Sequence, residues 1–131
     1  MSGRPALPEK TERIATQVVD SAVKVHSALE PGLLESVYET CLCIELKKRT
    51  IRHEKQIRIP IVYDGISIDS GLRLDLLVGG CVIVELKSVE RLLPVHDAQV
   101  LTYLKLAEVR LGLLLNFNVP LMKQGIRRII L

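Results

Sequence analysis

The apolar residues near the start of the chain recur at the spacing of a helix. They are three or four positions apart: Ile14, Val18, Ala22, Val25 and Leu29. This period predicts a helix with one buried face. It should begin near Pro8 and Glu9, because proline suits the first turn and an acid there meets the positive end of the helix dipole. Pro31 ends it, since proline disfavours helical backbone at the residue before it.

A second helix is expected over residues 34–49. Its apolar stripe is formed by Leu34, Val37, Cys41 and Ile44. Glu35 lies on a neighbouring stripe with Tyr38, Leu42 and Leu46. We therefore expect the side chain of Glu35 to point inward.

From Glu54 the hydrophobic period changes to two, which is typical of strands. Ile57, Ile59 and Ile61 share one face, Gln56 and Arg58 share the other, and residues 63–65 indicate a turn. Further strands are expected over residues 72–78, 82–87, 110–117 and 125–131, with a third helix over residues 95–108. The order ααβββαββ predicts an α/β (α+β) fold in which a mixed central sheet is flanked by helices.

The strands on either side of Gly79 and Gly80 can be aligned in two registers. A two-residue turn would pair Leu74 with Glu85 and place a carboxylate among apolar residues. A three-residue turn, residues 79–81, makes one face wholly apolar instead. The pairs on that face are Val78 with Val82, Leu76 with Val84 and Leu74 with Leu86. The hydrophobic pattern selects this second register, which a glycine in the left-handed conformation makes feasible.

The other face of this register places charged residues opposite one another: Asp75 pairs with Glu85, and Arg73 with Lys87. Two opposed carboxylates repel unless a cation lies between them. Two interpretations follow. The face is either a salt-bridged, solvated surface, or a site where the two carboxylates bind Mg²⁺ or Mn²⁺ and Lys87 orients or helps to deprotonate a water.

Length and composition exclude several classes of protein for this chain. The 131 residues suit one domain, expected over residues 9–131 after a disordered leader of residues 1–8. No apolar stretch is long enough for a transmembrane helix and no signal-peptide pattern is present, so a cytoplasmic protein without a membrane partner is the default expectation. P-loop, dinucleotide-binding and zinc-protease motifs are missing from the sequence, which removes those classes.

The net charge of +3 is compatible with a phosphate-bearing partner without demanding one. Basic residues gather in one segment: Lys47, Lys48, Arg49, Arg52, Lys55 and Arg58. They form either a solvated basic face or a nucleic-acid contact. The three cysteines are expected to be reduced, because Cys41 and Cys43, two positions apart, do not face each other on a helix.

Asp75, followed on the next strand by Glu85-x-Lys87, resembles the PD-(D/E)XK nuclease motif. Leu74 stands where that pattern often has proline, a minor departure because many members lack proline there. The segment of residues 32–38, Gly-Leu-Leu-Glu-Ser-Val-Tyr, is similar to the signature of the GxxExxY family, which is assigned to the same superfamily.

Two later segments extend the resemblance over nearly the whole chain after residue 10. Gln99 and Tyr103 match the Q-x-x-x-Y helix that follows the E-x-K strand in this family. Asn116-Phe117 and the closing residues 127–130 complete the resemblance.

The resemblance implies a restriction-endonuclease-like core with one shared site. Its implied metal ligands are Asp75 and Glu85, and its implied catalytic residues are Asp75, Glu85, Lys87 and Glu35. Glu35 would be the helical acid that supports the metal or its water. Gln99 and Tyr103 would contact the substrate or position Lys87, and their spacing puts both on one helix face. His96 beside them is either a metal ligand or a residue near the start of its helix.

Together these residues favour a nuclease that uses Mg²⁺ (or Mn²⁺) and a metal-activated water to hydrolyse DNA phosphodiester bonds. The alternative is a catalytically inactive nucleic-acid-binding or assembly module on the same scaffold. The apolar surplus of the sequence is also compatible with a homo-oligomer.

Overall fold

The computed structural model describes residues 5–131. Its helices are α1 (Glu9–Leu29), α2 (Glu35–Lys48) and α3 (Pro94–Ala107), with a short 3₁₀ helix η1 (Met122–Gly125). Its strands are β1 (His53–Arg58), β2 (Ile61–Tyr63), β3 (Ile66–Ile68), β4 (Arg73–Val78), β5 (Val82–Lys87), β6 (Leu111–Asn116) and β7 (Ile126–Ile130). Of the leader predicted over residues 1–8, residues 1–4 lie outside the described part, and Arg110 donates hydrogen bonds to the carbonyls of Pro5 and Ala6.

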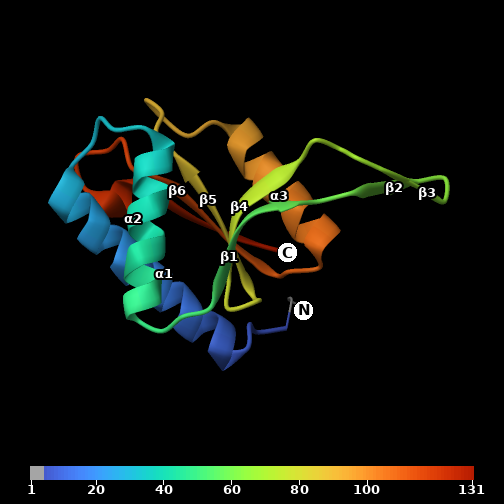
Figure 1. Ribbon diagram of the computed structural model, residues 1–131, viewed down its shortest axis with the longest axis horizontal. Coiled ribbons are helices and arrows are strands. Elements are labelled where there is room, and N and C mark those ends of the chain that lie inside the picture. Colours follow the sequence, from blue (N-terminus) through green and yellow to red (C-terminus); the bar gives the residue numbers. More distant parts are fainter. Residues whose placement is uncertain (1–4) are drawn as a thin grey trace.

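Five strands form one mixed sheet in the order β1-β4-β5-β6-β7. Strands β5 and β6 are parallel, and the other neighbours are antiparallel. In Figure 1, α1 and α2 lie on one side of the sheet and α3 lies on the other. The predicted mixed sheet flanked by helices is confirmed. Within residues 5–131, none of the helices combines the length and the apolar character that crossing a bilayer requires.

Each face of the sheet has its own hydrophobic core. The α1–α2 core includes Val18, Ala22, Leu42, Leu46, Leu76, Val84 and Leu113. The α3 core contains Ile59, Leu74, Ile83, Val100, Tyr103, Leu104, Val109 and Leu114. Because helices cover both faces, the central strands β5 and β6 are nearly continuous apolar runs, and every residue of β6 is buried.

The predicted order ααβββαββ describes the five-stranded sheet, but the chain contains two more strands. β2 and β3 form a separate hairpin between β1 and β4. The turn expected at residues 63–65 connects them, with positive φ at Asp64 (51°) and Gly65 (75°), as a tight hairpin turn requires. Three-residue strands are too short for a period of two to identify.

The buried face of α2 differs from the predicted stripe. Leu34 is 74% exposed and Ile44 is 49% exposed, whereas Tyr38, Leu42 and Leu46 are fully buried. The expectation that Glu35 points inward was also wrong, because its side chain is exposed.

The physical reason for this orientation of α2 is Tyr38. Its ring stacks on Phe117 with centroids 4.5 Å apart, and its hydroxyl donates a hydrogen bond to the carbonyl of Glu30 over 2.5 Å. The same hydroxyl accepts a hydrogen bond from the amide of Leu33. One buried aromatic residue thus fixes both the loop between the helices and the face that α2 turns inward.

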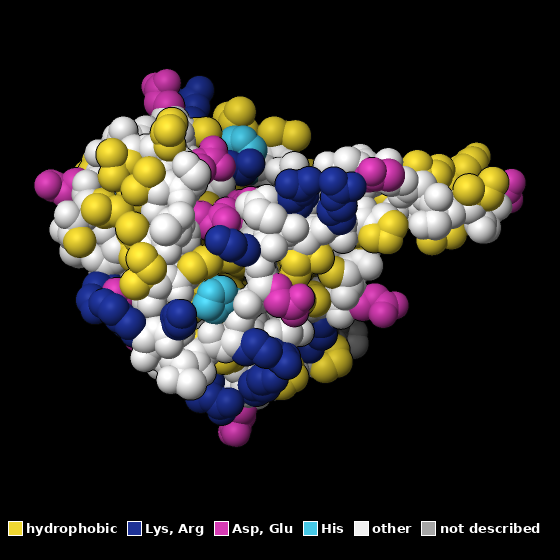
Figure 2. All heavy atoms as spheres, in the orientation of Figure 1, with side chains coloured by type: hydrophobic (Ala, Val, Ile, Leu, Met, Phe, Trp, Pro, Cys, Tyr) yellow, Lys and Arg dark blue, Asp and Glu magenta, His cyan; other side chains and the backbone are white. Residues whose placement is uncertain are grey.

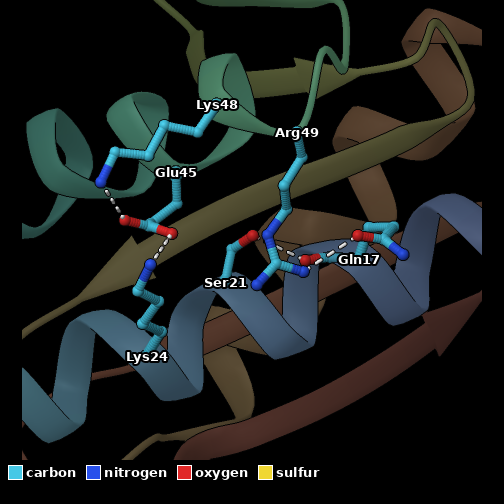
Figure 3. Close-up of polar contacts among 6 residues, drawn as sticks. All are labelled: Gln17, Ser21, Lys24, Glu45, Lys48 and Arg49. Atoms are coloured by element: carbon cyan, nitrogen blue, oxygen red, sulfur yellow. Dashed lines mark hydrogen bonds and ion pairs between the residues drawn. The ribbon is translucent and has the colours of Figure 1, made fainter.

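Polar contacts join α1 to α2 on the outer side (Figure 3). The largely buried Glu45 carboxylate lies 3.0 Å from the Nζ of Lys24 and 3.4 Å from that of Lys48. The hydrogen bond from Lys24 lowers the pKa of Glu45. Farther along, Arg49 donates to Gln17 Oε1 over 2.9 Å. These contacts hold the two helices together as a single layer on the sheet.

The register chosen from the hydrophobic pattern is confirmed for the end of the β4–β5 hairpin next to the turn. Its ladder consists of the pairs Val78 with Val82, Leu77 with Ile83 and Leu76 with Val84. The predicted pairs farther from the turn are missing from the ladder: Leu74 with Leu86, Asp75 with Glu85, and Arg73 with Lys87. The three-residue turn is possible because Gly79 and Gly80 adopt positive φ values of 60° and 70°.

Beyond Leu76 the strands depart from the predicted continuous apolar face. Leu74 packs in the α3 core, whereas Leu76 packs in the α1–α2 core. The residue between them, Asp75, is skipped in the β1–β4 ladder, as is Gln56, which faces it and has a φ of 54°. Strand β4 therefore changes the face it presents at Asp75, because regular pairing stops there.

Gly112 of β6 allows α3 to approach the sheet closely. A Cβ atom at this position would lie 2.5 Å from Cγ1 of Val100 on α3. We expect Gly112→Ala to lower the free energy of unfolding by about 1–3 kcal/mol through overpacking. Val100→Ala in the same chain makes room, so the double variant should lose less stability than the sum of the single variants. Urea denaturation measures all three variants, and strictly additive losses would contradict the close approach.

Candidate active site

The site begins where β4 and β5 stop pairing. The amide of Asp75 donates a hydrogen bond to Oε1 of Glu85 over 2.8 Å. The amide of Leu86 donates to Oδ2 of Asp75 over 2.9 Å. Each carboxylate thus bonds to the backbone of the opposite strand. These crossed bonds hold the two acids side by side.

Glu85 is the most deeply buried acid of the site. Only 4% of the residue is exposed to solvent. Burial, followed by the negative charge of Asp75, raises the pKa of Glu85 to about 8, although the amide of Asp75 and the charge of Lys87 act in the opposite direction. Without a cation, Glu85 therefore holds a proton at neutral pH.

Lys87, the last residue of β5, is held by backbone contacts from β6 and the segment after it. The amide of Phe117 donates to the carbonyl of Lys87 over 2.9 Å. Asn116 lies opposite Lys87 in the parallel register and is almost fully buried. Its side-chain amide donates to the carbonyl of Val89 (3.0 Å), and its Oδ1 accepts from the amide of Val89 (3.1 Å). Asn116 thus clamps the chain just after the lysine.

Helix α3 brings Gln99 and Tyr103 to the acids. Burial, and then the charges of Glu85 and Asp75, raise the pKa of the Tyr103 hydroxyl, whereas the side chain of Gln99 acts to lower it. His96 caps the start of this helix, because its Nδ1 accepts a hydrogen bond from the amide of Leu93 over 3.0 Å. This contact agrees with the interpretation of His96 as a residue at the helix start.

Helix α2 brings a second acid, Glu39, to the site in addition to Glu35, the acid predicted from the sequence. Glu35 is the first residue of α2 and is exposed. One turn later, Oε2 of Glu39 accepts a hydrogen bond from Nε2 of Gln56 over 2.9 Å, and the same nitrogen lies 3.4 Å from Oδ1 of Asp75. Burial and then the charge of Asp75 raise the pKa of Glu39, with a smaller contribution from Glu35. Glu39 is therefore the helical acid connected to Asp75.

Sequence reasoning missed Glu39, Gln56 and the clamp made by Asn116. Glu39 lies four residues after Glu35 on the same side of the helix, so the same argument could have found it. Gln56 could have been found by aligning β1 with β4, because it then faces Asp75. For Asn116 no local signal exists, since its contacts depend on the crossover from β5 through α3 to β6.

The acids fit a hard divalent cation such as Mg²⁺. Mg²⁺ is usually held by one or two carboxylates, and water and substrate phosphate complete its shell. In the part of the chain that the structure describes, no three His, Cys, Asp or Glu side chains form a ready metal cage. Asp75 and Glu85 offer such a sparse donor set, and a cation beside them would offset the burial and repulsion that raise the pKa of Glu85.

The raised pKa of Glu85 predicts a pH dependence of stability in the metal-free protein. Between the usual value of 4.5 and about 8, the unfolded chain has lost this proton and the folded chain has kept it. The free energy of unfolding should therefore fall as pH rises through this window, by up to about 1.4 kcal/mol per pH unit. Urea denaturation with a chelator at several pH values measures the slope. Glu85→Gln should remove this contribution, and equal slopes for both proteins would refute the assignment.

Comparison with known proteins agrees with this geometry. The profile of the PD-(D/E)XK nuclease superfamily matches residues 12–129. Neither the search of curated proteins nor that of solved structures found a match. The family match covers the five strands of the mixed sheet almost completely. It also covers Asp75, Glu85 and Lys87, which lie where β4 and β5 stop pairing. On this match, the chain belongs to the PD-(D/E)XK nuclease superfamily.

Proposed function

We propose that the chain is a Mg²⁺-dependent nuclease that hydrolyses DNA phosphodiester bonds with water as the nucleophile, and that residues 9–131 act as one nuclease domain. The observation that carries the proposal is the pair of crossed hydrogen bonds at Asp75 and Glu85, with Lys87 two residues farther along the strand. The segment of residues 32–38 supports a narrower assignment to the GxxExxY family.

In this proposal, Asp75 and Glu85 would hold the cation through carboxylate oxygens. When bound, Mg²⁺ would polarise the phosphate and make water easier to deprotonate. The ammonium group of Lys87 orients the attacking water and offsets negative charge that develops on the phosphate. The clamp of Asn116 on Val89 limits the movement of the chain that carries this lysine, so its charge stays directed at the reacting atoms.

Substrate contacts are proposed on both sides of the acids. Gln99 and Tyr103 line the site from α3. On the outer side, the exposed Lys55 lies near Glu39. Arg58 and Arg73 lie opposite each other on β1 and β4, at the base of the β2–β3 hairpin. Figure 2 shows Lys and Arg side chains next to acidic side chains on this face. Cations around a pair of acids suit a polyanion whose scissile phosphate reaches the cation.

Removal of the lysine tests the proposal most directly. We expect Lys87→Ala to lower turnover by about two to three orders of magnitude, because it removes a charge that acts in the transition state. Cleavage of labelled double-stranded, single-stranded and branched DNA, and of RNA, is measured with Mg²⁺ or Mn²⁺. Lys105→Ala, on the exposed face of α3, is the matched control and should keep full activity.

Unchanged cleavage by Lys87→Ala would refute the assigned role of this residue. Calorimetric titration with Mn²⁺ separates the nuclease from an inactive nucleic-acid-binding module. The nuclease requires binding that Asp75→Asn and Glu85→Gln weaken. Salt-sensitive DNA binding with no Mn²⁺ binding and no product would instead favour the inactive module.

The two acids of α2 can be ranked by conservative substitution. We expect Glu39→Gln to lower kcat/KM by about 10- to 100-fold, since groups that orient ligand carboxylates usually have effects of this size. Glu35→Gln, at the exposed start of α2, should have a smaller effect. Steady-state cleavage rates measure both variants. A larger loss in Glu35→Gln would instead identify Glu35 as the supporting acid.

A further inference from the structure

The hairpin of β2 and β3, here called the arm (residues 61–68), projects away from the rest of the domain (Figure 1). Its cross-strand pairs are Ile61 with Ile68, Val62 with Ser67 and Tyr63 with Ile66. Pairs two positions apart share a face, so one face of the arm carries only large apolar residues. Tyr63 is 72% exposed and Ile66 is 65% exposed. An isolated two-stranded hairpin is only marginally stable in water. We therefore expect the apolar face of the arm to pack against another protein surface.

The charges around the arm disfavour nucleic acid as its partner. Residues 59–72 contain Asp64 and Asp69 but no Lys or Arg. A segment that binds the phosphate backbone needs cations. The occupant should instead combine apolar residues with positive charge.

The outer side of the helix layer has these properties. A groove of about 180 Å³ between α1 and α2 is lined by Lys24, Val25, Ala28, Leu29, Cys41, Ile44 and Glu45. Small-molecule sites are usually larger, roughly 300–1,000 Å³, so the groove suits protein side chains better. The exposed Leu34 and Val37 extend the same apolar surface along α2.

The groove is positively charged at one end. Lys24 and Lys48 share the single carboxylate of Glu45, which leaves one net positive charge. Lys47, the residue before Lys48 on α2, carries another exposed ammonium group. This end complements the aspartate at the tip of the arm.

We propose that the arm of one copy packs into the α1–α2 groove of a second copy, and that the second arm makes the same contact in return. The arm and α2 lie at opposite ends of the molecule in Figure 1, so the arm cannot fold onto its own groove. Figure 2 shows hydrophobic side chains gathered at both places. Two copies placed side by side in opposite directions bring each arm to the other groove, which closes the assembly as a symmetric dimer.

Sedimentation velocity over about 1 to 100 µM protein tests the dimer. The wild-type chain should form dimers that dissociate on dilution. Ile66→Lys on the arm and Ile44→Lys in the groove should each raise the dissociation constant at least about tenfold, because a charge would be buried in an apolar contact. Ser67→Lys, on the opposite face of the arm, and Lys105→Glu, on α3, should remain dimeric. Urea denaturation checks that each variant is folded.

A mixture of the two disrupted variants gives the sharper result. Ile66→Lys retains an intact groove, and Ile44→Lys retains an intact arm. An equimolar mixture should therefore form a heterodimer with one of the two contacts, weaker than the wild type but tighter than either variant alone. A monomeric wild type, a series of higher oligomers, or a mixture no tighter than its components would each overturn the proposal. The experiment involves no cleavage, so its outcome is independent of the nuclease assignment.

Discussion

The structure depends on how two acidic side chains, Asp75 and Glu85, are held together where strands β4 and β5 stop pairing. Each accepts a backbone hydrogen bond from the opposite strand, so the usual ladder is replaced by side-chain contacts at this point. These bonds position the acids, but they do not remove the repulsion between them or the cost of burying Glu85. A proton or a cation has to compensate. The same feature that makes the site ready for a divalent ion therefore disfavours the metal-free, fully ionised form.

The split between β4 and β5 also explains how both helix layers reach one site. A regular sheet would separate residues of α2 from those of α3. Here β4 changes the face it presents at Asp75, so that acid lies near Tyr103 of α3 and also near Gln56, which bonds to Glu39 of α2. The interruption of the ladder is thus a positioning device. Regular hydrogen bonds between the strands are lost here, and residues from both helix layers can reach Asp75.

The sequence alone predicts the parts that depend on a strong local pattern. The period of two and the glycines at 79 and 80 determine the hairpin register next to the turn. Beyond the last ladder pair, crossed hydrogen bonds hold the acids together. The face of α2 could not be predicted in the same way, because α2 has two apolar stripes. The stripe that is buried contains Tyr38, which stacks on Phe117 just after the distant strand β6. The roles of Gln56 and Asn116 could not be predicted from a local pattern either. Their partners come from other strands of the sheet, and no local period records them.

The arm and the site are built on the same two strands. β1 carries Gln56 and continues into β2, and β4, which follows β3, carries Asp75. The base of the arm is joined by the pairs of Ile57 with Leu74 and Arg58 with Arg73, and by the ion pair of Arg58 with Asp69 at 3.5 Å. An arm held against a second copy would therefore restrict the strand ends next to the acids. Such a restraint favours a preorganised site.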